Sequence, residues 1–334
     1  MDDLSAYLLP MEIFFSACTL LGIAGNLLMV IVTIKAKNLQ TACHKLIGIT
    51  CFADVLHQSG QFPFLYGLYT RTQWTTQADC FYVQLVPIFG VLTGCVLLLN
   101  LGVDRLIAVT LPAFYRQNQQ THLYFFLHLI APLVYYFFFL FYAFQFRNDR
   151  PAMCAIPEFF DGPSNSLWAT VSVILNALVV FCYLLVYVKL RTSSFSNAAR
   201  AVFKSLFITV AIVSCGWFAT MFTNFLSVAF GATGNTMFLI QTYAGIPVNF
   251  AAACNFPVYY TISTEHRNAI RSLLFNKKPE KSGEFPTATN NTNNESSFLI
   301  KSPVNSPDAH RQPSSHLLIN ADAVKPESRV SLPQ

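Results

Sequence analysis

The chain has 334 residues, of which 54% are hydrophobic and only 11% are charged. A soluble globular domain carries about 25% charged residues. This composition therefore excludes a soluble globular domain and indicates a membrane protein. The formal net charge is +5, but the positions of the charges along the chain are more informative than their sum.

Seven apolar stretches follow one another, at roughly residues 8–34, 46–69, 80–111, 122–146, 166–190, 201–230 and 237–262. Each is longer than the ~20 residues with which a helix crosses a bilayer core. Backbone groups in lipid must be paired within the segment, so we expect helices rather than open strands. The sequence therefore predicts an all-α membrane protein, a seven-transmembrane helix bundle forming one domain over residues 1–275.

The first, second and seventh predicted spans each hold a polar residue near mid-membrane: Asn26, Asp54 and Asn255. Polar groups at this depth are costly, and an ionisable one is functional by default. We expect the three side chains to share one hydrogen-bonded, hydrated site. The alternative for Asn26 is a contact that only joins helices, worth about 0.6 kcal/mol. The seventh span also contains Pro257 and Tyr260.

Two of the nine cysteines lie on the side predicted to be extracellular. Cys80 begins the third span, and Cys154 lies in the long loop before the fifth. Because both face an oxidising compartment, we predict a disulfide between them. The alternative is two free surface thiols.

A charged pair, Asp104 and Arg105, lies at the other end of the third span. Arg105 follows Cys80 by 25 residues, which is about 37 Å of helix at 1.5 Å per residue. Cys80 and Arg105 are therefore expected at opposite membrane faces. Pro112 follows Arg105 by seven residues, at the start of the next loop. The pair is either an anchor at a helix end or a functional group.

The distribution of Lys and Arg predicts that the N-terminus is outside and the C-terminus inside. In that orientation the outer segments hold Arg71, Arg147 and Arg150. The inner segments hold thirteen Lys and Arg residues, against three in the outer segments. The thirteen are Lys35, Lys37, Lys45, Arg105, Arg116, Lys189, Arg191, Arg200, Lys204, Arg267, Arg271, Lys277 and Lys278.

The last part of the chain changes character twice. Residues 263–275 place Ala269, Ile270, Leu273 and Leu274 on one side, which predicts a short amphipathic helix on the inner membrane surface. Residues 276–334 are rich in Ser, Thr, Asn and Pro, which predicts a disordered cytoplasmic tail. Phosphorylation of its Ser and Thr would add negative charge. The alternative is an inert tail.

The motifs as a set resemble those of rhodopsin-like G-protein-coupled receptors. The matching residues are Gly25-Asn26, Asp54, Cys80, Asp104-Arg105-Leu106, Pro112, Trp217 and, loosely, Asn255, Pro257 and Tyr260. Stretches such as "GVDRLIAVTLPAFY", "KSLFITVAIVSCGWF" and "YAGIPVNFAAACNFPVYY" are most similar to nematode serpentine chemoreceptors of the Srsx type. The resemblance departs from the family pattern at Leu106, which replaces an aromatic residue, and at Ala219, which replaces a kink-forming proline.

The resemblance implies roles for these residues. Asp104 would restrain Arg105 at rest, and Arg105, with Pro112 nearby, would couple to a heterotrimeric G protein. An activation network would comprise Asn26, Asp54, Trp217, Asn255, Pro257 and Tyr260. The start of the sixth span, "NAARAVFKS", has no acid to restrain Arg105 further, so we expect raised basal activity. Kinases and arrestin are expected on the tail.

The ligand is constrained by what the spans lack and by what they offer. Pro87 stands where amine receptors carry an Asp, and residues 237–262 contain no Lys for a retinal Schiff base. The outer half of the bundle offers aromatic and amide groups: His57, Gln58, Gln61, Tyr66, Tyr82, Gln84, Gln241 and Tyr243. These suit a small neutral or weakly polar molecule. The alternative is a neuropeptide, with Arg147 and Arg150 meeting an acidic segment.

Other classes fit less well. A transporter would show inverted repeats and paired broken helices, and a seven-span odorant channel would have its N-terminus inside. We find no enzyme motif of the zinc-protease, hydrolase or phosphate-loop kinds. The sequence therefore predicts a non-enzymatic receptor of the plasma membrane, with sensory cilia as a candidate location, and with no cofactor, metal or nucleic acid.

Overall fold

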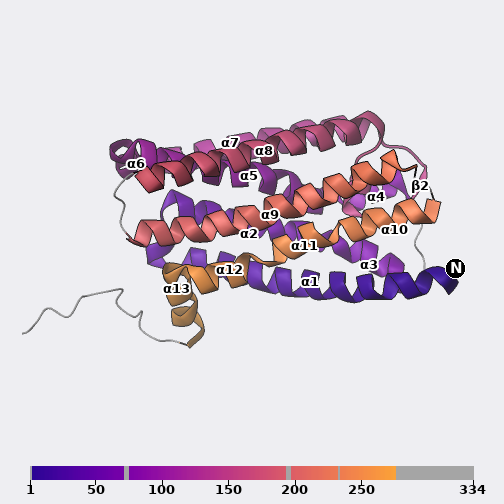
Figure 1. Cartoon of the computed structure of the whole chain (residues 1–334), viewed down its shortest axis with the longest axis horizontal. Helices are drawn as coiled ribbons and strands as arrows, with labels where there is room; N and C mark the ends of the chain where they lie inside the picture. The colour runs from indigo at the N-terminus through magenta and orange to yellow at the C-terminus, as the bar shows by residue number, and fades with distance from the viewer. Residues whose placement is uncertain (1, 71–74, 193–196, 232–233, 276–334) are drawn as a thin grey trace, which may run out of the picture. The chain divides into compact units, whose positions relative to one another are not determined.

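Long helices running side by side make up most of the structure (Figure 1). A computed structural model describes residues 2–70, 75–192, 197–231 and 234–275. The longer helices of the first part are α1 (Asp2–Lys35), α2 (Ala42–Ser59), α5 (Leu85–Thr110), α7 (His122–Gln145) and α8 (Gly162–Thr192). They are followed by α9 (Asn197–Ala229), α10 (Gly234–Ala244), α11 (Ile246–Ala253), α12 (Asn255–Ile262) and α13 (Thr264–Phe275). The shorter elements are η1 (Lys37–Leu39), α3 (Gln61–Thr70), α4 (Gln77–Val83), α6 (Pro112–Asn118) and η2 (Ile156–Phe159).

Four helices within the described residues are long and apolar enough to cross a membrane. They cover Leu8–Lys35, Leu85–Thr110, His122–Gln145 and Gly162–Arg191. The second predicted span is divided between α2 and α3, and the seventh is divided among α10, α11 and α12. Each of these two predicted spans is thus a series of shorter helices rather than one continuous helix.

Prolines and a glycine account for these divisions. Pro63, Pro247 and Pro257 lie within the first turns of α3, α11 and α12, where a proline has no N–H to continue the preceding helix. Gly60 lies between α2 and α3, and a Cβ there would be 2.7 Å from the Gln84 side chain and 2.8 Å from the Cβ of Pro87. Only glycine allows α5 to approach the chain this closely.

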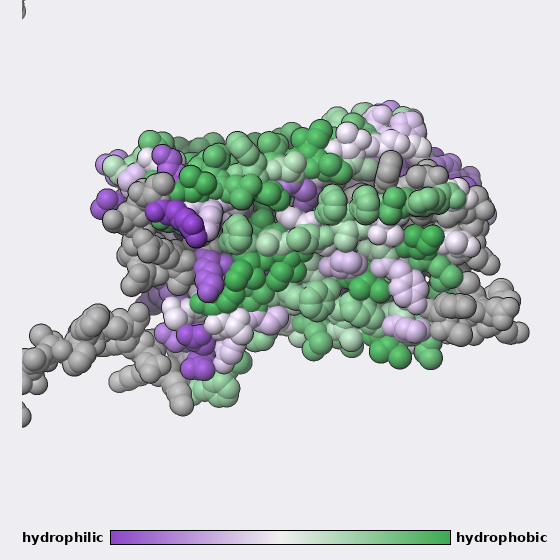
Figure 2. Space-filling model, in the orientation of Figure 1, coloured by the Kyte–Doolittle hydropathy of each residue, from purple (hydrophilic) through white to green (hydrophobic). Residues whose placement is uncertain are grey.

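The helix α5 is packed on α2, α7 and α8, while α9 packs on α8, α10, α11 and α12. The largest apolar core lies among these helices and includes the fully buried Leu46, Leu97 and Tyr183. Large apolar side chains are also exposed, among them Phe141 and Phe218. Hydrophobic residues cover the middle of the face seen in Figure 2, and hydrophilic ones gather near α6 and α13. An outer surface of this kind suits burial in lipid.

The loop between α7 and α8 is fastened to the start of α5. β2 (Pro151–Ala152) pairs antiparallel with β1 (Thr75–Thr76), a pairing that the sequence did not predict. Cys80 of α4 forms a disulfide with Cys154, two residues after β2. The predicted disulfide is therefore confirmed, and it holds this loop over one end of the bundle.

The helix predicted over residues 263–275 is α13. Ala269 and Ile270 are buried against the bundle, whereas Leu274 and Phe275 are exposed. The predicted tail, residues 276–334, lies outside the described residues.

Candidate functional site

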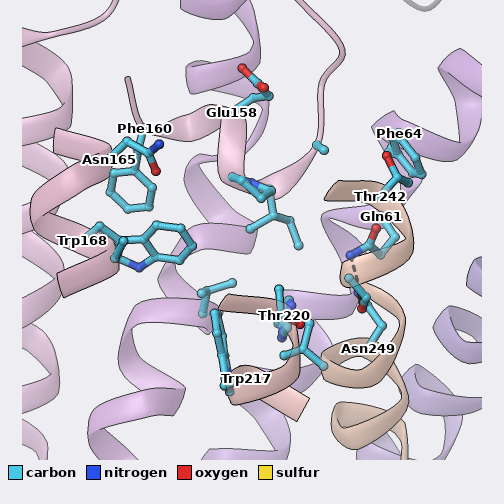
Figure 3. A pocket seen from close by; sticks show the side chains of 18 of the residues that line it. Gln61, Phe64, Glu158, Phe160, Asn165, Trp168, Trp217, Thr220, Thr242 and Asn249 are labelled. Atoms are coloured by element: carbon cyan, nitrogen blue, oxygen red, sulfur yellow. Dashed lines mark hydrogen bonds between the residues drawn. The ribbon is translucent and has the colours of Figure 1, made fainter. Parts of the chain in front are cut away.

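A cavity of about 750 Å³ lies near the end of the bundle that carries β1 and β2. Aromatic side chains form much of its wall, and Figure 3 shows Phe64, Phe160, Trp168 and Trp217 around it. Trp168 stacks on Phe160 with ring centroids 4.7 Å apart and meets Trp217 edge-on at 6.1 Å. The volume and the apolar wall are typical of a site for one small molecule.

Most polar groups of the cavity wall are already hydrogen-bonded within the protein. Gln61 Nε2 donates to Asn249 Oδ1 at 2.8 Å, the dashed line in Figure 3. Asn249 Nδ2 donates to the Gly245 carbonyl at 2.9 Å, and the Thr220 hydroxyl donates to the Ala244 carbonyl at 2.5 Å. These contacts link α3, α9 and α11, so the wall is held together by its own polar groups.

Charge at the cavity is confined to one region and is paired there. Among the described residues that line the cavity, Arg150 and Glu158 carry the formal charges, and their side chains are 2.7 Å apart. Arg150 Nε also donates to Asp161 Oδ1 at 3.0 Å. The two carboxylates therefore neutralise Arg150, one of the two basic residues considered for an acidic peptide.

The residues predicted to bind a ligand divide into three groups. Two line the cavity: His57 and Gln61. Two are buried outside it, where their amides donate to backbone carbonyls: Gln58 and Gln84. Three are exposed and do not line it: Tyr66, Tyr82 and Tyr243. The side chain of Gln241 lies outside the described residues.

The three polar residues of the first, second and seventh predicted spans lie together in the bundle. Asn255 Nδ2 is 2.6 Å from Asp54 Oδ2 and 3.0 Å from Asn26 Oδ1. Asn26 Nδ2 in turn donates to the Ala252 carbonyl at 2.9 Å. A small cavity of about 30 Å³ lies against Asp54 and Asn255, and this is room for at least one water.

The other residues assigned to an activation network lie in different surroundings. Trp217 lines both the large and the small cavity. Pro257 is exposed, and Tyr260 accepts a 3.4 Å hydrogen bond from Arg271 of α13. Tyr259 is 3% exposed and packs on the His266 ring. Tyr259 therefore faces the core, whereas Tyr260 faces α13.

At the opposite end of α5, Asp104 and Arg105 are joined directly. Arg105 Nη2 and Nε donate to Asp104 Oδ2 at 2.5 and 2.9 Å, and Asp104 is fully buried. The Tyr124 hydroxyl donates to Asp104 Oδ1 at 3.1 Å. Arg105 also donates to the Tyr115 hydroxyl, which lies 3.4 Å from Asp104 Oδ2. The Asp104 carboxylate is thus contacted by one arginine and two tyrosines.

Sequence reasoning missed both tyrosines. Pro112 begins α6 and Tyr115 comes one turn later, so the proline was a signal for a helical turn beside Arg105. Tyr124 belongs to α7, and no sequence signal marks it because its contact depends on how α7 packs on α5.

The chain is similar to one protein family and to several known receptors. The family model described as "Serpentine type 7TM GPCR chemoreceptor Srsx" matches residues 19–274. Olfactory receptor 5M1 of Homo sapiens is 28% identical over 110 residues, which are 33% of this chain and 35% of that receptor. Neuropeptide Y receptor type 5 of Rattus norvegicus is 30% identical over 105 residues, 31% of this chain and 23% of the receptor.

The KiSS-1 receptor of Rattus norvegicus is 31% identical over 110 residues, 33% of this chain and 27% of the receptor. The chain therefore spans about a third or less of the length of these relatives. The family match is much longer, and it includes the small cavity, all of the large cavity except Phe15, the Asp104–Arg105 pair and nearly all of α13. The chain accordingly belongs to the serpentine seven-transmembrane G-protein-coupled chemoreceptors of the Srsx type.

Proposed function

We propose that this protein is a chemosensory receptor that binds a small extracellular molecule in the large cavity and triggers nucleotide exchange on a heterotrimeric G protein. The observation that carries the proposal is the position of Trp217. It lines the cavity that suits a ligand and also the small cavity against Asp54 and Asn255. A ligand that shifts this side chain acts directly on the polar centre of the bundle.

Coupling to the G protein requires that Arg105 change its partners. In the closed state Asp104 and Tyr115 hold it. An agonist activates only by binding the open state more tightly than the closed one. In that open state Arg105 leaves Asp104 and faces the G protein, and α6, which Pro112 begins, forms part of the same surface.

The proposed topology has seven crossings, with the N-terminus outside and the C-terminus inside. The supporting observation is the excess of Lys and Arg in the segments assigned to the cytoplasm. α13 would lie on the inner membrane surface, with the exposed Leu274 and Phe275 toward lipid. The tail would be the substrate of kinases and bind arrestin, and the receptor would reside in the plasma membrane of sensory endings.

A peptide ligand is the second candidate, because two of the similar proteins are named for neuropeptide Y and KiSS-1. An acidic peptide is disfavoured by the pairing of Arg150 with Glu158 and Asp161. Arg147 is also engaged, since its guanidinium lies 3.5 Å from the Phe144 ring centroid.

The deciding experiment measures G-protein nucleotide exchange in cells that express the receptor, exposed separately to a small-molecule library and to a neuropeptide library. We expect responses to small molecules, lost in Arg105→Ala at equal surface expression. Responses to peptides alone would overturn the chemosensory assignment. Antibody access to terminal tags on intact cells tests the topology, and an accessible C-terminal tag would contradict it.

A further inference from the structure

We infer that His57 anchors the ligand and thereby sets its chemical class: an uncharged, largely apolar molecule that carries one hydroxyl or carbonyl group. This inference rests on the proposed function, because it assigns the polar contact within the same cavity. It adds a residue that decides which molecules the receptor accepts.

His57 is a buried polar residue of the cavity wall. It is 8% exposed, it lines the cavity, and its ring makes no hydrogen bond to any described residue. Gln61, Asn249 and Thr220 are by contrast already paired within the protein. The ring is therefore available to a ligand, and a ligand that forms a hydrogen bond with it gains that interaction on binding.

The charges around the cavity decide which hydrogen-bonding group fits. Arg150 is shared by Glu158 and Asp161, so a ligand carboxylate finds no unpaired cation on the described wall. Glu158 is the acid of this cluster that lines the cavity, and it is held by Arg150, so a ligand ammonium would have to compete with that guanidinium. Burying such an ion without a partner costs more than the hydrogen bond returns. A hydroxyl or carbonyl avoids this cost, because a neutral imidazole offers one N–H donor and one bare nitrogen acceptor.

His57 also lies between the two cavities. Together with Val91, Trp217 and Val248 it lines both the large cavity and the small one beside Asp54. The two ring nitrogens of a histidine are linked, because a hydrogen bond made by one sets whether the other donates or accepts. A ligand held by one nitrogen therefore changes whether the other donates or accepts, in a ring that lines both cavities.

The test uses matched series of alcohols, ketones, ammonium ions and carboxylates built on the same hydrocarbon skeletons. G-protein activation by each is measured with the wild type, His57→Leu and His57→Gln at equal surface expression. The matched control is Thr93→Val on α5, whose buried hydroxyl bonds only to its own helix at Phe89 and lines neither cavity.

We expect alcohols or ketones to activate the wild type and Thr93→Val equally. Their potency falls about tenfold in His57→Leu, the effect of one lost buried hydrogen bond, and is partly restored in His57→Gln. Activation by ammonium ions or carboxylates, or equal potency on His57→Leu, overturns the role of His57 but leaves a small-molecule receptor. If no compound series activates the G protein and peptides do, the proposed function is overturned as well.

Discussion

Asp104 is a buried carboxylate whose oxygens are fully engaged by the protein. Arg105 and Tyr115 approach one oxygen, and Tyr124 donates to the other. Hydrogen bonds to a charged group are each worth about 1.5–3 kcal/mol, more than neutral ones. At the residue scale, Asp104 is therefore held by two tyrosines as well as by the arginine.

Removing the hydroxyl in Tyr124→Phe should raise agonist-free signalling. The loss of one charge-assisted hydrogen bond, about 1.5 kcal/mol, shifts the closed–open equilibrium about tenfold toward the open state. The measurement is basal nucleotide exchange at matched surface expression. The control is Tyr142→Phe on the same helix, whose hydroxyl makes no hydrogen bond to the described residues and whose ring stacks on Phe138. Unchanged basal exchange in Tyr124→Phe would assign the restraint to Arg105 and Tyr115 alone.

At the scale of elements, α13 is attached to the start of α2 by a polar cluster. His44 Nε2 is hydrogen-bonded to Glu265 Oε2 at 2.9 Å, and His44 Nδ1 to the Thr41 hydroxyl at 2.7 Å. His44 and His266 lie with ring centroids 5.3 Å apart. The hydrogen bond from His44 lowers the pKa of Glu265, and burial lowers the pKa of His266 to about 3.

The packing of α13 should weaken as the pH falls. His266 is neutral in the folded state, while in the unfolded chain it takes up a proton below its ordinary pKa of 6.5, so stability is lost as the pH drops from 6.5 toward 3. The loss approaches about 1.4 kcal/mol per pH unit, or about 2 kcal/mol near pH 5. Thermal unfolding of the purified receptor at neutral and acidic pH measures it.

In that measurement His266→Gln should remove most of the pH dependence. Glu265→Gln is the control. The pKa of Glu265 is lowered from its ordinary value of 4.5, so this carboxyl stays ionised at about pH 5 to 6.5, where His266 is expected to change the stability. An unaltered pH dependence in His266→Gln would show that another group governs it.

The junction between α2 and α3 depends on the absence of a side chain at Gly60. Gly60→Ala should destabilise the protein by about 1–3 kcal/mol, because the new Cβ meets Gln84, Pro87 and Ile156 within 2.9 Å. Gly94→Ala on α5 is the matched control, since its Cβ would meet only the Ala53 Cβ, at 3.7 Å. The midpoint of thermal unfolding separates the two, and equal midpoints would contradict the steric explanation.

At the scale of the whole molecule, the cavity is lined in part by a loop that the disulfide and the small sheet hold in place. Met153, Ala155 and Ile156 of this loop line the cavity, and Cys154 lies among them. The site is thus made from the bundle and from a segment that follows α7, and neither part encloses it alone.

The double variant Cys80→Ser with Cys154→Ser should lower stability by about 3 kcal/mol and abolish the response to agonist, because the loop is no longer fixed over the cavity. Surface expression and agonist-stimulated exchange are the two measurements. Cys215→Ser is the control, since this cysteine is free and exposed. A normal response from the double variant would show that the sheet alone holds the loop.

The sequence alone determined that the protein is a helical membrane protein. It also determined the positions of its polar residues within the predicted spans and of its disulfide-forming cysteines. Apolar length, the cost of polar groups in lipid and the oxidising exterior act on local residue types, so they predicted the helices, the Cys80–Cys154 disulfide and the group of Asn26, Asp54 and Asn255. Local prolines explain in retrospect why the seventh predicted span is divided.

The tertiary structure alone decided which polar side chains line the cavities and which contact Asp104 and Arg105. Among the predicted aromatic and amide groups, only packing determined that Gln84 bonds to a backbone carbonyl while His57 lines both cavities. Tyr124 meets Asp104 because α7 packs on α5, although 20 residues separate them in the sequence. The physical reason is that hydrogen-bond satisfaction depends on neighbours in space, and residue spacing along one helix does not specify the neighbouring helix.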